Sequence, residues 1–197
     1  MTHRDNNPRK LHDGYFTAHI GLYPKFSTFV ASYTDSIEKL FKSVSEGNES
    51  ADVVGVPLLF LMRHTLELGY KFSLVYLCER NSNVFNPEDR KNGEGHSLTR
   101  LHKRLGKEYA QASKKGIVPE SDHGFDDYYA LTKKGMELFD DLDKSSTKLR
   151  FPKIDESLAF GRGKKVNLLD AKNVFDDAMI LLATLADVIA GDEYHYG

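Results

Sequence analysis

The chain has little cysteine: Cys78 is the single cysteine among 197 residues. One thiol cannot form an intramolecular disulfide, and it excludes a zinc site built on several cysteine ligands. Structural disulfides belong to oxidising compartments and are rare in the cytosol. We therefore expect a cytoplasmic protein.

The sequence also lacks a strong net charge and an uncharged apolar segment. The formal net charge is -2 at pH 7, so contact with nucleic acid or an anionic membrane would require a local basic patch. Residues 1–14 lack the apolar core of a signal peptide. The most apolar segment, residues 53–77, contains four ionisable side chains, which argues against a bilayer-spanning helix: Arg63, His64, Glu67 and Lys71. We expect a soluble protein with no membrane partner.

Several catalytic and metal-binding motifs are missing. The segment Gly161-Arg162-Gly163-Lys164-Lys165 lacks the spacing and the following Ser or Thr of a Walker A loop. The eight histidines are scattered without a recognised metal-ligand spacing. Neither a Gly-x-Ser-x-Gly elbow nor a Cys–His pairing is present. We expect no metal and no cofactor.

The main pattern in the sequence is the helical spacing of its apolar residues. Apolar residues recur at three- and four-residue steps over residues 25–46, 52–80, 97–115, 122–143 and 170–190. The second of these segments is apolar on nearly all sides, which is typical of a helix at the centre of a bundle. Because the connections are short to medium and strand signals are few, the sequence predicts an all-α, antiparallel up-and-down bundle of about five helices.

The boundaries of these segments predict the domain organisation. We expect a flexible lead-in over residues 1–18, a single helical domain over 19–191 and a C-terminal tail over 192–197. Asp52, Ser97 and Asp170 are the predicted N-caps of the second, third and fifth helices. Periodicity fails between the fourth and fifth helices. There, two extended pieces at 148–152 and 165–168 predict a short β-hairpin or an extended loop at about 148–168.

Three charged residues of the second predicted helix lie on one stripe. Arg63, Glu67 and Lys71 are spaced four apart, and Glu67 stands on the favourable side of Lys71 for an ion pair. In such an apolar helix, unpaired charges would be costly, so these side chains must pair with one another or face a cleft. Two interpretations stay open: a structural network that fixes helix packing, and a polar pocket in the bundle.

His96 directly precedes the predicted cap of the third helix. The positive end of the helix dipole opposes protonation of the imidazole there, so we expect a neutral histidine able to accept a proton. Free N–H groups at a helix start also attract anions such as phosphate. Arg100 begins a basic face that includes Lys103 and Arg104. That face is either a contact for a phosphate backbone or a solvated surface, and His96 is either functional or locally packed.

Three sequence elements together resemble a known family. Leu66-Glu67-Leu68-x-x-Lys71, Gly95-His96-x-Leu98-x-x-Leu101 and Leu149-Arg150-Phe151-Pro152 follow one another in this order. The order resembles the HEPN-like superfamily of small bacterial helical proteins, in which E-L-x-x-K, H-D-L-x-x-L and R-Y-P elements recur. The likeness covers residues 53–190. It implies a helical bundle, often a homodimer, that binds or acts on RNA or nucleotides, in many members within toxin–antitoxin or phage-defence systems.

The ribonuclease members of that superfamily carry Arg-x(4–6)-His and cleave RNA without a metal. Arg90 and His96 match this spacing and are the candidate catalytic pair. However, nine arginines and eight histidines in this chain predict about one such match by chance. The pair also lies in a glycine-containing loop before a helix, whereas the ribonucleases place it at a helix end.

The Gly-His-x-Leu element instead resembles members that are associated with nucleotidyltransferases or that lack proven catalysis. By this resemblance His96, Glu67, Lys71 and Arg150 cluster, with Phe151 in place of the usual tyrosine. Two functions remain open. One is an RNA- or nucleotide-binding protein with metal-independent endoribonuclease activity; the other is a non-catalytic module for dimerisation or for a protein partner, in which the cluster is structural. The candidate ligand-binding residues are Glu67, Lys71, Arg63, Arg150 and Arg100.

Overall fold

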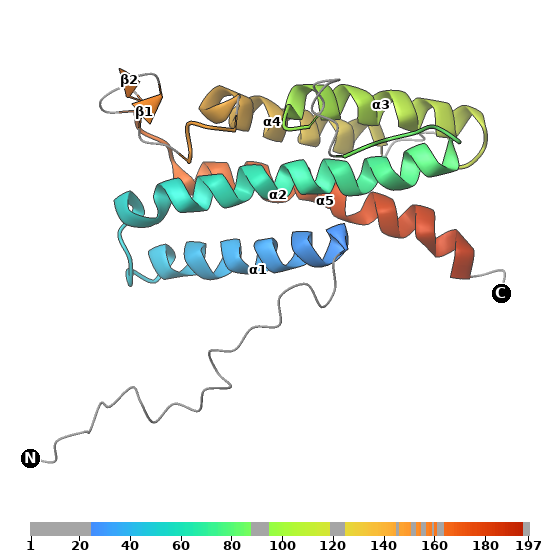
Figure 1. The fold of residues 1–197 in the computed structure, drawn as a ribbon. Coiled ribbons are helices and arrows are strands. Elements are labelled where there is room, and N and C mark those ends of the chain that lie inside the picture. Colours follow the sequence, from blue (N-terminus) through green and yellow to red (C-terminus); the bar gives the residue numbers. More distant parts are fainter. Residues whose placement is uncertain are drawn as a thin grey trace, which may run out of the picture.

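The fold was examined in a computed structural model, which describes residues 25–87, 95–118, 125–144, 146–150, 153–154, 157–158, 160 and 164–194. In this part of the chain five helices form a bundle (Figure 1). They are α1 (Phe26–Ser45), α2 (Ala51–Arg80), α3 (Leu98–Lys114), α4 (Phe125–Asp143) and α5 (Leu168–Tyr194). The predicted all-α bundle is therefore confirmed.

Helix α2 is the central element. Figure 1 shows α1 on one side of α2 and the pair α3 and α4 on the other, and α5 packs against both α2 and α4. Buried residues occur on every side of α2, including Leu58, Leu66 and Leu74, which are fully inaccessible to solvent. By contrast, α1 buries Val30 and Ile37 on one face. The apolar pattern of α2 thus reflects its neighbours on several sides.

One of the three predicted helix caps is correct. The Ser97 hydroxyl accepts a hydrogen bond from the backbone N–H of Arg100 at 3.4 Å, at the start of α3. The other two helices begin earlier than predicted, because a residue before the aspartate supplies the cap. Ser50 caps α2 and Asn167 caps α5, each by accepting backbone N–H groups. Asp52 and Asp170 instead lie in the first turn, where a negative charge still favours the helix dipole.

The connection between α4 and α5 differs from the predicted pairing of 148–152 with 165–168. The chain forms two-residue strands, β1 (Lys153–Ile154) and β2 (Ser157–Leu158), which pair antiparallel. The buried carboxylate of Asp143 accepts the backbone N–H groups of Thr147, Lys148 and Leu149 at 2.8–3.1 Å. Because these donors are used by a side chain, residues 148–150 form a turn at the end of α4 and cannot enter a ladder.

The ends of the predicted domain are described only in part. Helix α5 continues through Tyr194, past Gly191, where its end was predicted. The predicted lead-in over residues 1–18 lies outside the described residues. Within the described residues, no helix has both the length and the apolar character needed to cross a membrane.

Gly135 allows α4 and α5 to approach each other closely. A Cβ atom at this position would lie 2.7 Å from the Cβ of Ala178 on α5, which is closer than van der Waals contact allows. Gly55 in α2 is different, since a Cβ there would meet the Leu168 side chain at an ordinary 3.8 Å. The α4–α5 contact therefore requires a residue without a side chain at 135.

We predict that Gly135→Ala lowers the free energy of unfolding by about 1–3 kcal/mol, the usual cost of overpacking. In contrast, Gly55→Ala should leave stability unchanged or raise it by up to about 1 kcal/mol, because alanine favours a helix over glycine. Urea unfolding of both variants measures the difference. Adding Ala178→Gly to Gly135→Ala should relieve the overlap, and equal destabilisation by both single alanine variants would contradict this account.

Candidate functional site

Four polar residues meet where α2 passes the start of α3. Arg63, Glu67 and Lys71 lie on one stripe of α2, and His96 directly precedes the Ser97 cap of α3. We call these four residues the α2–α3 polar cluster. All three α2 members are buried, whereas 47% of the His96 side chain is exposed. The cluster therefore consists of three buried side chains on α2 and one side chain, that of His96, which is exposed to solvent.

Arg63 connects three parts of the chain. Its guanidinium donates from Nε to the carbonyl of Asp143 at 2.7 Å and from one Nη to the carbonyl of His96 at 2.8 Å. Its other Nη lies 3.4 Å from a carboxylate oxygen of Glu67. Arg63 is 1% exposed, so these contacts replace water around a buried charge. The side chain thereby joins α2 to the end of α4 and to the residue that precedes α3.

Glu67 is the shared acceptor of the cluster. One carboxylate oxygen accepts from Nζ of Lys71 at 2.8 Å and lies 2.9 Å from Nδ1 of His96. Burial alone would raise the pKa of Glu67, but the hydrogen bond and charge of Lys71, together with His96, lower the pKa below its usual value. The carboxylate is therefore ionised at neutral pH. The predicted Glu67–Lys71 ion pair is confirmed.

The contact with Glu67 orients the imidazole of His96. A carboxylate can only accept, so Nδ1 must carry the proton that is shared with Glu67. Nδ1 is thereby occupied, while the side chain as a whole stays 47% exposed. A carboxylate that holds one ring nitrogen of an exposed histidine is an arrangement in which the other ring nitrogen accepts or donates protons in catalysis. The expectation that His96 is neutral stays a prediction.

A second histidine lies beside this cluster. The ring of His64 stacks on Phe60 with centroids 5.9 Å apart and meets the edge of Tyr33 at 5.1 Å. Burial lowers the pKa of His64, with Glu67 acting in the opposite direction. His64 is thus held among aromatic rings between α1 and α2. Its position three residues before Glu67 is the sequence signal that indicates this proximity.

Two predicted site residues lie at exposed positions, unlike the buried α2 members of the cluster. Arg150 is exposed and donates from Nε to the carbonyl of Ser146 at 2.6 Å. Arg100 is exposed on the first turn of α3. Arg90 lies outside the described residues, so the Arg90–His96 pair stays a prediction. No group of three or more His, Cys, Asp or Glu side chains suited to a metal ion occurs in the described part of the chain.

Sequence reasoning did not identify a buried histidine further along α3. Nδ1 of His102 lies 3.2 Å from the hydroxyl of Tyr70 and 3.4 Å from that of Thr132, so it links α2, α3 and α4. Burial, with a smaller effect from Lys133, lowers the pKa of His102 to about 4. The ring is 5% exposed and stacks on Tyr129. This histidine is neutral at pH 7 and holds helices together.

We predict that Glu67→Gln destabilises the fold by about 3–5 kcal/mol, because it leaves Arg63 and Lys71 buried without a compensating charge. The matched control is Glu137→Gln on α4, which removes an exposed i,i+4 partner of Lys133 and should cost under about 0.5 kcal/mol. Chemical denaturation at pH 7 measures both free energies of unfolding. Similar values for the two variants would contradict a role for Glu67 in holding the cluster.

The same variant should change the dependence of stability on pH. Since the pKa of Glu67 is lower in the folded state than in the unfolded chain, its contribution is present above the unfolded-state value and is lost as the pH falls through the folded-state value. The difference in unfolding free energy between wild type and Glu67→Gln should therefore shrink on acidification. A difference that stays constant down to pH 3 would count against ionised Glu67.

Comparison of the chain with protein-family models, with curated proteins and with solved structures gives no match. The resemblance to the HEPN-like superfamily accordingly stays a prediction.

Proposed function

We propose that this chain is an RNA- or nucleotide-binding helical protein whose ligand meets His96 at the start of α3. The observation that carries the proposal is the imidazole of His96, half-exposed and fixed through Nδ1 by the buried Glu67 carboxylate. Lys71 donates a hydrogen bond to the same carboxylate. Arg100 is exposed on the first turn of α3. Positive charge at a helix start favours phosphate groups, which every nucleotide carries.

The orientation of His96 also favours a catalytic form of this proposal. In metal-independent RNA cleavage the 2′-oxygen attacks the adjacent phosphorus, the bond from phosphorus to the 5′-oxygen breaks, and a 2′,3′-cyclic phosphate and a 5′-hydroxyl result. Nε2 of His96 would take the proton of the 2′-hydroxyl or give a proton to the leaving 5′-oxygen. A nearby cation would stabilise the charge that develops on phosphate. By resemblance, such an endoribonuclease would act in a toxin–antitoxin or phage-defence system, with Arg90 as the second catalytic group.

A non-catalytic function is the second candidate, and a different observation favours it. Arg63, Glu67 and Lys71 are buried and satisfy one another, as expected of a structural network. In this interpretation the protein is a module for dimerisation or for binding a protein partner. His96 would then lock α3 onto α2 and contact no ligand.

The proposal includes a cytoplasmic homodimer. Cys78 is a free, buried thiol, which agrees with a reducing compartment. Large apolar side chains at the starts of α2 and α5 are exposed, among them Val53 at 65% and Leu169 at 54%. They offer an apolar surface to a second copy of the chain. Light scattering of the purified protein should give twice the mass of one chain, and a monomer at micromolar concentration would exclude this part.

The test of the proposal compares two substitutions of His96 in EDTA. His96→Asn retains an N–H donor for Glu67 but cannot transfer protons, whereas His96→Ala removes both properties. We expect RNA binding, measured by fluorescence anisotropy, to weaken at least tenfold in His96→Ala. If the catalytic form holds, both variants should lose cleavage of a structured RNA by a factor of about 10²–10⁴.

The possible outcomes separate the candidates. Cleavage that is absent in wild type, or that survives in His96→Ala, rejects the endoribonuclease. Failure of wild type to bind RNA or AMP at micromolar concentrations rejects the whole proposal. A lower melting temperature of His96→Ala with unchanged RNA affinity would instead favour the structural module.

A further inference from the structure

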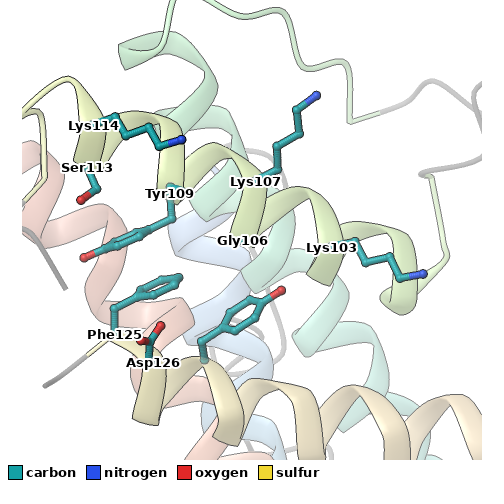
Figure 2. A pocket seen from close by; sticks show the side chains of 10 residues that line it. Lys103, Gly106, Lys107, Tyr109, Ser113, Lys114, Phe125 and Asp126 are labelled. Atoms are coloured by element: carbon teal, nitrogen blue, oxygen red, sulfur yellow. The ribbon is translucent and has the colours of Figure 1, made fainter.

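A groove of about 560 Å³ lies between α3 and the beginning of α4, apart from the α2–α3 polar cluster (Figure 2). Its α3 wall is a stripe with helical spacing, formed by Lys103, Gly106, Lys107, Ala110, Ser113 and Lys114. Its α4 wall contains Phe125, Asp126 and Tyr129, and Tyr109 contributes from α3. The volume falls in the range of pockets that hold small ligands or parts of larger ones.

Stacked aromatic rings form the floor of the groove. The rings of Tyr109 and Phe125 are nearly parallel, with centroids 3.4 Å apart. The ring of Phe125 also stacks on that of Tyr129, with centroids 5.3 Å apart. Figure 2 shows the rings of Tyr109 and Phe125 close together between α3 and the start of α4. The hydroxyl of Tyr129 donates to the carbonyl of His102 at 3.0 Å, which anchors the end of the ring column. The rings use their faces to stack on one another, so the floor is apolar and already ordered.

Gly106 is what lets Tyr129 reach this position. A Cβ atom at residue 106 would lie 2.6 Å from the Tyr129 hydroxyl, so any side chain there would displace the ring. Because Gly106 has no side chain, no atoms beyond the backbone extend into the groove from this position, which lies between Lys103 and Lys107. The groove is consequently open beside two positive charges.

The rim of the groove is positive. Lys103, Lys107 and Lys114 are exposed, and in Figure 2 the side chains of Lys103 and Lys107 extend away from α3 into solvent. Of the described residues that line the groove, Asp126 is the one with an acidic side chain. Among the described residues none of the three lysines forms an ion pair, unlike Lys39, Lys133 and Lys172. Their charge is thus available to an anionic ligand.

From this combination we infer that the α3–α4 groove binds single-stranded RNA. Proteins that bind single strands combine a positive groove, which follows the phosphates, with aromatic side chains that contact the bases. Lys103 and Lys114 are separated by roughly 16 Å along α3, at 1.5 Å per residue, which is longer than one phosphate group. This length favours a strand over a free nucleotide. The inference rests on the proposed interaction with RNA and adds the surface that holds the strand.

The test is the affinity of the full chain for fluorescein-labelled oligouridylate and oligoadenylate, measured by anisotropy over a range of salt concentrations. The groove variant is Lys103→Gln with Lys107→Gln. The matched control is Lys39→Gln with Lys42→Gln, which removes the same charge from exposed positions on α1. Phe125→Leu tests the aromatic floor, and His96→Ala is measured in parallel.

We expect the groove variant to bind at least tenfold more weakly and the α1 control to stay within twofold of wild type. The slope of log affinity against log salt should fall by about 1.4 in the groove variant, since each phosphate contact on a single strand contributes about 0.7. Phe125→Leu removes the central ring of the column and should weaken binding by at least about fivefold, the low end of the range for losing an aromatic contact with a base.

Other results would overturn the inference in distinguishable ways. Wild-type affinity in the groove variant, with binding lost in His96→Ala, rejects the groove and retains the proposed function. Binding lost in the groove variant but unchanged in His96→Ala supports the groove and rejects the role of His96. Failure of wild type to bind either oligonucleotide rejects both. Displacement of RNA by AMP at an equal nucleotide concentration would identify a free nucleotide, and not a strand, as the occupant.

Discussion

The arrangement of the α2–α3 polar cluster depends on one buried guanidinium. Arg63 has almost no contact with solvent, and its N–H groups are directed to two backbone carbonyls, at Asp143 and His96, and to the Glu67 carboxylate. A planar guanidinium offers donors in several fixed directions, which a lysine ammonium on a flexible stem does not. The end of α4 and the start of α3 are thereby held at defined positions on α2.

This constraint gives the polar cluster two properties at once. Its buried members form a closed network, because the negative charge of Glu67 is paired with the positive charges of Arg63 and Lys71 away from water. Its outer member, His96, is held from two sides: Arg63 binds its carbonyl and Glu67 binds its ring. A structural role for the cluster and a ligand-binding role therefore involve different atoms. The buried charges stabilise the fold, and the exposed edge of the imidazole is what a ligand can reach.

Local spacing predicted the parts of this arrangement that are local. The i,i+4 relation of Glu67 and Lys71 predicts their ion pair because residues four apart are neighbours on one face of a helix. The capping serine before α3 was equally recognisable. By contrast, the main partners of Arg63 are backbone carbonyls 33 and 80 residues away, and a carbonyl has no residue-specific signature. The turn held by Asp143 was missed for the same reason, since its acceptor role depends on backbone N–H groups.

The α3–α4 groove shows a second limit of sequence reasoning. Periodicity separates the buried face of α3 from its basic face, but it does not reveal which rings of α4 lie beside that basic face. The position of Tyr129 depends on the missing side chain at Gly106, a relation between two helices. In this chain the faces of helices were predictable from one segment at a time, whereas the sites between helices were not.

Glu67 fixes the imidazole of His96 through Nδ1. The most direct test is the ¹⁵N NMR spectrum of the histidine rings at a pH where imidazole is neutral, with His96 assigned by substitution. We expect the Nδ1–H tautomer in wild type and a change of the Nε2 resonance when RNA is added. An Nε2–H tautomer, or a spectrum that is unchanged in Glu67→Gln, would contradict it.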